Sequence, residues 1–147
     1  MNIGKMTEQD INAIVQLQAA DIKYLEKYSR AQFLEMLNDK NYYMLTAKDG
    51  ESVGGYLIAK CGVDELELYQ IVVGTSNKRS GVGSQLIKNL PDFAKINNIN
   101  SIYLEVRVDN ENAIAFYKAL GFIGVGRRKG YYYGSMDAIL MNYKIEQ

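Results

Sequence analysis

The chain has no histidine, one cysteine and one proline among its 147 residues. The absence of histidine excludes Ser-His-Asp and Cys-His catalysis, histidine-ligated metals and the usual proton shuttle near neutral pH. Any acid–base chemistry must therefore use carboxylate, tyrosine, lysine, cysteine or water. The single cysteine, Cys61, excludes an internal disulfide and a cysteine-rich zinc site, which fits a reducing compartment. We expect a cytoplasmic protein that holds no metal.

An excess of charge of one sign is also missing, because 17 basic side chains balance 17 acidic ones. A neutral chain has no bulk field that attracts nucleic acid or an anionic membrane. No apolar run approaches the length of a membrane span, and the N-terminus lacks a signal-peptide pattern. We therefore expect neither a nucleic-acid nor a membrane partner. The length fits a single domain, residues 1–147, that buries a core without metal or disulfide support.

The residues also predict an order of strands and helices. The first third should form a short strand and two helices that begin after Thr7 and Ser29, and the middle should form strands over 42–47, 53–61 and 65–73. A helix should follow Gly83, and a strand should cover 101–108. The last part should form a helix from Asn110 to Gly121 and closing strands over 122–127 and 136–143. Pro91 removes a helical hydrogen bond, so we expect a kink or a break near it. A helical crossover predicts that strands 65–73 and 101–108 are parallel, within a mixed α/β sheet.

The turn before the third helix has the sequence Lys78-Arg79-Ser80-Gly81-Val82-Gly83-Ser84. The first N–H groups of a helix lack internal partners, and the helix dipole places partial positive charge there, so the turn predicts a pyrophosphate site. Gly81 and Gly83 remove Cβ atoms that would keep a phosphate from the backbone. The spacing matches neither a Walker loop nor a dinucleotide fingerprint. On this segment alone, a turn that needs glycine only for its dihedral angles is an equal alternative.

The site should lie at one edge of the sheet. Ligands of such sheets bind at the carboxyl ends of strands, where neighbouring connections diverge. This rule places the glycine turn, Val73, Glu105 and Asn110 around one cleft.

Three segments together resemble the Gcn5-related N-acetyltransferases. They are Ile71-Val72-Val73 with the glycine turn, Leu104-Glu105-Val106-Arg107, and the stretch from Asn110 through Ala113 and Tyr117 to Gly121-Phe122. The resemblance covers residues 64–143 and implies a mostly antiparallel sheet with a central parallel strand pair and flanking helices. It implies acetyl-CoA as co-substrate, bound by Ile71, Val72, Val73, Lys78, Arg79, Ser80, Gly81, Val82, Gly83, Ser84 and Asn110. Lys78 departs from the family pattern, because Arg or Gln is usual there.

The same resemblance implies two catalytic residues. Taken alone, Glu105 is a glutamate on the polar face of an alternating strand, which is usually a solvated surface residue. The resemblance implies instead a general base that acts through water. Taken alone, Tyr117 is a core aromatic residue at helical spacing, whereas the family pattern implies that it is the acid that protonates the sulfur of CoA. A tyrosine with a free pKa of about 10 can protonate a thiolate leaving group whose pKa is about 8.5.

Within the family, the resemblance is closest to the bacterial enzymes that acetylate the N-terminal alanine of a ribosomal protein. It implies that Tyr28, Tyr131 and Tyr132 contact the acceptor, with Tyr131–Tyr133 and Tyr24–Tyr28 on opposite sides of the thioester. Near pH 7 the neutral fraction of an α-amine with a pKa of about 8 is roughly one-tenth, whereas the neutral fraction of a lysine side chain is about one part in a few thousand.

Residues 26–29 lack the aromatic-Pro-Trp-Ser pattern that often precedes the second helix. Two alternatives therefore stay open. One is an acetyltransferase for a small amine, such as a polyamine, an aminoglycoside or an amino acid, and the other is a non-catalytic acyl-CoA-binding module. We expect a monomer or a weak dimer.

Overall fold

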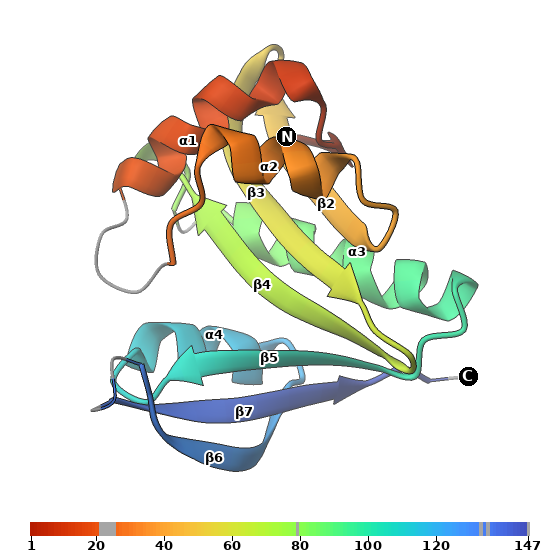
Figure 1. Ribbon diagram of the computed structural model, residues 1–147, viewed down its shortest axis with the longest axis vertical. Coiled ribbons are helices and arrows are strands. Elements are labelled where there is room, and N and C mark those ends of the chain that lie inside the picture. The colour runs from red at the N-terminus through yellow and green to blue at the C-terminus, as the bar shows by residue number, and fades with distance from the viewer. Residues whose placement is uncertain (21–25, 79, 133, 135, 147) are drawn as a thin grey trace.

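Figure 1 shows the computed structural model, which describes residues 1–20, 26–78, 80–132, 134 and 136–146, but not the side chain of Tyr132. The elements are β1 (Asn2–Lys5), the 3-10 turn η1 (Glu8–Asp10), α1 (Ile11–Ala20), α2 (Arg30–Leu37), β2 (Tyr42–Asp49), β3 (Ser52–Cys61), β4 (Glu65–Val73), η2 (Thr75–Asn77), α3 (Val82–Ile96), β5 (Ser101–Arg107), α4 (Glu111–Ala119), β6 (Ile123–Tyr132) and β7 (Met136–Lys144). The predicted order of elements is confirmed. No helix among the described residues is long and apolar enough to cross a membrane.

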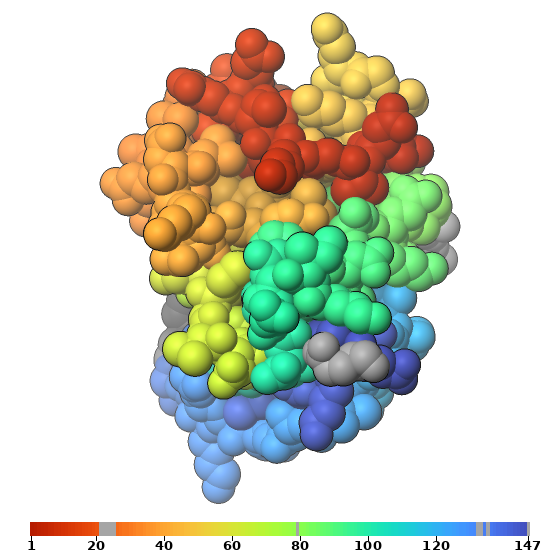
Figure 2. Space-filling view, turned by 90° about the vertical axis from the view of Figure 1, so that its right-hand side faces the viewer, coloured from red at the N-terminus to blue at the C-terminus, as the bar shows by residue number. Residues whose placement is uncertain are grey.

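The strands of the described residues belong to one seven-stranded sheet in the order β1-β2-β3-β4-β5-β7-β6. Every neighbouring pair is antiparallel except β4 and β5, whose predicted parallel pairing is confirmed. Helices cover both faces, with α1 and α2 in front of the sheet and α3 behind it in Figure 1. The N-terminal half, red to yellow, forms the upper part of the molecule, and the blue C-terminal strands form the lower part (Figure 2).

The parallel pair is short, and the two strands then separate. Pairing runs from Glu65–Ser101 to Glu67–Tyr103 and stops there, although both strands continue. Figure 1 shows β4 and β5 diverging from this contact. Ile58 of β3 pairs with Gln70 and the next residue pairs with Leu68, so Tyr69 is an extra residue in β4. Such a bulge bends a strand, and it lies just beyond the last parallel pair. The sheet therefore opens between two strands that each keep one antiparallel neighbour.

Two apolar cores hold the helices on the sheet. Burial of this area is the main favourable contribution to folding. The core on the α3 side contains Leu57, Leu66, Leu86, Ile102, Leu104 and Met141, whereas the core under α1 and α2 contains Ile11, Ile14, Phe33, Tyr56, Ile58 and Val72.

Local signals fix the helix ends as expected. The Ser29 hydroxyl accepts the Gln32 amide N–H at 3.1 Å, and the Gln32 side chain accepts the Ser29 N–H at 2.8 Å, which completes the predicted capping box. Asn110 Oδ1 accepts the amide N–H of Ala113 at 3.3 Å and so caps α4.

One local expectation is wrong in part. Helix α3 runs unbroken from Val82 to Ile96 with Pro91 inside it, so the break expected there does not occur. Leu86, Leu90 and Ala94 are fully buried along one face of this helix. Their packing on the sheet spans both sides of the proline and offsets the missing hydrogen bond.

The end of α4 generates a stability prediction. Gly121 has φ 101°, and a Cβ there would lie 3.1 Å from the Tyr143 ring. We expect Gly121→Ala to lower the free energy of unfolding by about 1–3 kcal/mol, because the left-handed conformation and the close ring both oppose a side chain. Urea unfolding measures the change. Gly124→Ala is the matched control, since a Cβ at Gly124 meets nothing within 4 Å. Equal stabilities of the two variants would contradict this account of the helix end.

Candidate active site

A cleft of about 1610 Å³ lies where β4 and β5 diverge. Its walls are β4, β5, the N-terminal turn of α3, α4, residues 26–28 and Tyr131. It gathers most residues that the sequence predicts for the site, namely Tyr28, Ile71, Val72, Val73, Lys78, Gly81, Val82, Gly83, Ser84, Glu105, Asn110, Tyr117 and Tyr131.

Five of the residues predicted for the site are not among those that line the cleft. Ser80 is described but is not among the residues that line the cleft, and its amide N–H donates to the carbonyl oxygen of Asn77 at 3.3 Å. Arg79 lies outside the described residues, as do Tyr24 and Tyr133. The backbone of Tyr132 pairs with Met136 at the end of β6.

The start of α3 presents backbone donors to the cleft. Gly81 is the N-cap with φ 86°, and its carbonyl oxygen accepts the Gln85 N–H at 3.0 Å, which begins the helical ladder. The amides of Val82, Gly83 and Ser84 precede that ladder and therefore have no acceptor within the helix. The helix dipole adds partial positive charge at the same point. These donors form the kind of turn that binds a phosphate.

The two glycines of the turn serve different purposes. A Cβ on Gly81 would meet nothing within 4 Å, so the space beside this residue is open, and its positive φ favours glycine. A Cβ on Gly83 would lie 3.2 Å from the Phe116 ring and 3.7 Å from Val73. Gly83 therefore allows α3 to approach α4 closely. The sequence argument gave both glycines one role, the access of a phosphate, and the geometry adds a packing role for Gly83, while both glycines line the cleft.

Glu105 lies in the middle of β5, and its side chain is 9% exposed. One of its oxygens, Oε1, accepts the Tyr103 hydroxyl at 2.8 Å and lies 2.7 Å from a guanidinium nitrogen of Arg128. Tyr131 also hydrogen-bonds to Glu105, which is the main cause that raises the pKa of Tyr131. The carboxylate is thus enclosed and oriented, unlike a solvated surface glutamate.

Tyr117 lines the cleft from α4. It is 8% exposed, and its ring packs at 5.3 Å from that of Phe116 and at 5.7 Å from that of Phe122. Its carbonyl oxygen accepts the Phe122 N–H at 3.0 Å, in the turn that ends α4. The residue is part of the core, as its spacing indicates, and it lines the cleft as well.

Several residues of the site were not identified from the sequence. Glu67 lines the cleft, and burial raises its pKa, with a further rise from the charge of Glu105. Tyr69 also lines the cleft, and burial raises its pKa. The pKa of Tyr103 is raised by burial and by its hydrogen bond to Glu105. The alternation of β5 places Tyr103 beside Glu105, but nothing in the sequence brings Arg128 of β6 to them.

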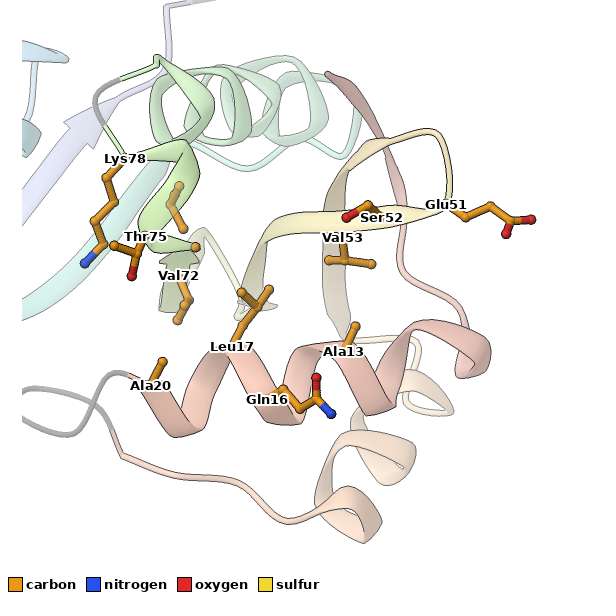
Figure 3. A pocket seen from close by; sticks show the side chains of 12 residues that line it. Ala13, Gln16, Leu17, Ala20, Glu51, Ser52, Val53, Val72, Thr75 and Lys78 are labelled. Carbon is orange, nitrogen blue, oxygen red and sulfur yellow. The ribbon is translucent and has the colours of Figure 1, made fainter.

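A second cavity of about 380 Å³ lies between α1 and the ends of β3 and β4. Figure 3 shows Leu17 of α1 facing Val72, with Thr75 and Lys78 at one side. Lys78 lines both this cavity and the main cleft. Among the described residues, no three His, Cys, Asp or Glu side chains lie close enough together to hold a metal ion.

The chain matches the model of the acetyltransferase (GNAT) family over residues 11–122. It is 37% identical over 145 residues to an uncharacterized protein, ML0378, of Mycobacterium leprae, and the match covers 95% of this chain and 39% of that protein. It is 32% identical over 136 residues to N-alpha-acetyltransferase RimI of Mycobacterium tuberculosis, covering 90% of this chain and 84% of the relative. The chain therefore spans less than half of ML0378 and most of the second relative.

The fold is similar to that in the crystal structure of the ribosomal-protein-S18-alanine N-acetyltransferase from Escherichia coli. The TM-score is 0.85 at 26% sequence identity, and the match covers 99% of this chain and 94% of that chain.

Proposed function

This chain belongs to the acetyltransferase (GNAT) family, and from that membership we propose that it acetylates the N-terminal amine of a protein, with alanine as the favoured terminal residue. The acetyl donor of such an N-acetyltransferase is acetyl-CoA. The observation that carries the proposal is the cleft, which has phosphate-type donors at one end and Glu105 within it. The names of the Mycobacterium tuberculosis and Escherichia coli relatives support the acceptor.

In this proposal acetyl-CoA lies along the opened edge of β4. Its pyrophosphate accepts hydrogen bonds from the first amides of α3, beside the open space at Gly81. The backbone groups of residues 71–73 hold the pantetheine arm, because pairing between β4 and β5 stops at Glu67 and, among the described residues, leaves that edge of β4 without a strand partner. A backbone N–H there polarises the thioester carbonyl. No metal takes part in this scheme.

The reaction needs a base and an acid. The amine nitrogen attacks the thioester carbonyl carbon, and Glu105 takes the proton from the amine through a water molecule. When the C–S bond breaks, the Tyr117 hydroxyl gives its proton to the departing sulfur. Both side chains line one cleft, Glu105 from β5 and Tyr117 from α4, which supports these two roles.

Tyrosines support a protein terminus as the acceptor. Tyr28 and Tyr131 line the cleft from two different segments. Burial raises the pKa of Tyr28 to about 12, so its hydroxyl stays protonated and can donate to a peptide carbonyl. We further propose that residues 1–147 act as one domain in the cytoplasm, since all strands join one sheet and the single cysteine fits a reducing compartment.

The acceptor is tested with a panel of amines. We expect a peptide with an N-terminal alanine to be acetylated faster than the same peptide with a blocked terminus and a free lysine, because an α-amine is far more often neutral near pH 7. Mass spectrometry locates the acetyl group, and thiol release gives the rate. If the blocked peptide, a polyamine or an aminoglycoside reacts faster, the proposal of an N-terminal acceptor is wrong, while the assignment to the acetyltransferase family still holds.

The proton transfers are tested by Glu105→Gln and Tyr117→Phe. Each should lower kcat by the roughly 10²–10⁴-fold typical of a lost acid or base. The affinity for acetyl-CoA should change little. Glu35→Gln on the exposed face of α2 and Tyr43→Phe, whose ring stacks on Phe93, repeat the same chemical changes away from the cleft. If Glu105→Gln or Tyr117→Phe has the same kcat as its control, the substituted residue has no part in the mechanism.

The pyrophosphate site is tested by Gly81→Val. A branched side chain in the open space should weaken CoA binding at least tenfold, because hydrogen bonds to a charged group are worth about 1.5–3 kcal/mol each. Gly50→Val is the matched control, since Gly50 also has a positive φ, 62°, and nothing within 4 Å of its Cβ position. Calorimetry measures both affinities. Equal CoA affinity in the two folded variants would place the pyrophosphate elsewhere.

A further inference from the structure

Residues 26–28 form one wall of the cleft although they belong to no helix or strand. Two buried glutamine side chains reach this wall from α1 and β4. We propose that Gln18 and Gln70 are positioning residues that hold this wall and thereby set the affinity for the amine acceptor. The inference rests on the proposed function, because it assigns the wall to the acceptor side of that reaction.

Gln18 holds the wall at two points. It lies on α1 and is 3% exposed. Its Nε2 donates to the carbonyl oxygen of Tyr28 at 2.8 Å, and its Oε1 accepts the Tyr28 amide N–H at 2.7 Å. A side-chain amide thus pairs with a backbone amide as a neighbouring strand would. The Lys27 ammonium adds a bond to the backbone carbonyl of Gln18 at 3.0 Å.

Gln70 holds the other end of the wall. It lies on β4 directly after the bulge residue Tyr69 and is 4% exposed. Its Oε1 accepts the hydroxyl of Tyr56 at 2.8 Å, which orients the amide so that Nε2 donates to the carbonyl oxygen of Glu26. Tyr56 is fully buried on β3. The wall is therefore tied to the same strand that continues into Ile71.

The glutamine side chains bind backbone groups of the wall, and ring packing in turn holds the Tyr28 side chain. The Tyr28 ring packs edge-on against Phe33 at 5.9 Å, and Phe33 packs in the same way against Tyr56 at 6.1 Å. The two amides and this row of rings hold the Tyr28 hydroxyl at one place in the cleft.

An apolar side chain of the same length fills the space but cannot hold the wall. With methionine at position 18, the N–H and C=O groups of Tyr28 lose their partner, and a buried polar group without a partner is costly. The segment would then move toward water. The α3 turn depends on other contacts, such as that between Ser80 and Asn77, so the site for acetyl-CoA should stay intact.

The test compares Gln18→Met and Gln70→Met with Gln16→Met, which makes the same change at an exposed position of α1. The acceptor is whichever amine in the panel reacts best with the unmodified protein. We expect the acceptor KM to rise roughly tenfold or more in Gln18→Met and Gln70→Met, because a change of this size corresponds to the loss of one or two hydrogen bonds. The affinity for acetyl-CoA and kcat at saturating acceptor should stay within about twofold of the control.

A second measurement does not need an acceptor. Amide hydrogen exchange should show that Tyr28 loses protection in Gln18→Met and keeps it in Gln16→Met. Together with the rise in acceptor KM, this result supports the proposal. An unchanged acceptor KM in both buried variants overturns it and leaves the N-acetyltransferase intact. If the unmodified protein acetylates no amine in the panel, the proposed function itself fails, and unchanged exchange at Tyr28 then rejects the positioning role separately.

Discussion

The separation of β4 from β5 is the constraint on which the rest of the site depends. The two strands share three residue pairs, and each then keeps a long antiparallel partner on its other side, β3 for β4 and β7 for β5. The opening is stable because only the two facing edges lose their partners. Backbone groups on those edges need hydrogen bonds, and a ligand can supply them. The extra residue Tyr69 bends β4 just where the pairing stops.

The opening also brings together elements that are distant in the sequence. Because Gly83 has no side chain, α3 approaches Phe116 of α4 closely, so the donors of one helix and Tyr117 of the other face the same cleft. On the lower side, β6 carries Arg128 to Glu105 of β5. One opening in the sheet thus receives phosphate-type donors, a buried carboxylate and a tyrosine hydroxyl.

Signals that act over a few residues could be predicted from the sequence, and contacts between distant segments could not. The capping box at Ser29 and the alternation of β5 needed only neighbouring residues, whereas the unbroken course of α3 through Pro91 depends on burial along the whole helix. The sequence pattern of Glu105 is that of a surface residue, because its enclosure depends on two other side chains. One is Arg128 of β6, and the other is Tyr103 on the same face of β5.

The two positioning glutamines do leave a trace in the sequence. Gln18 follows Ile11 and Ile14 at helical spacing, and Gln70 alternates with the buried Leu68 and Val72, so each occupies a position where the pattern predicts an apolar residue. A polar residue at such a position must find a hydrogen-bond partner. The sequence alone could not say that both partners lie in residues 26–28.

In the proposed reaction, the charges of the cleft favour a weakly basic amine. Burial raises the pKa of Glu67, and repulsion from the neighbouring Glu105 carboxylate raises it further, while the charge of Arg128 lowers it. A cationic amine that enters is attracted, but the same negative field also opposes loss of the proton that must leave before attack. An α-amine of pKa about 8 tolerates this opposition better than a lysine of pKa about 10.4. Because Arg128 pairs with Glu105, the negative field at this proposed base is weaker than two free carboxylates would create.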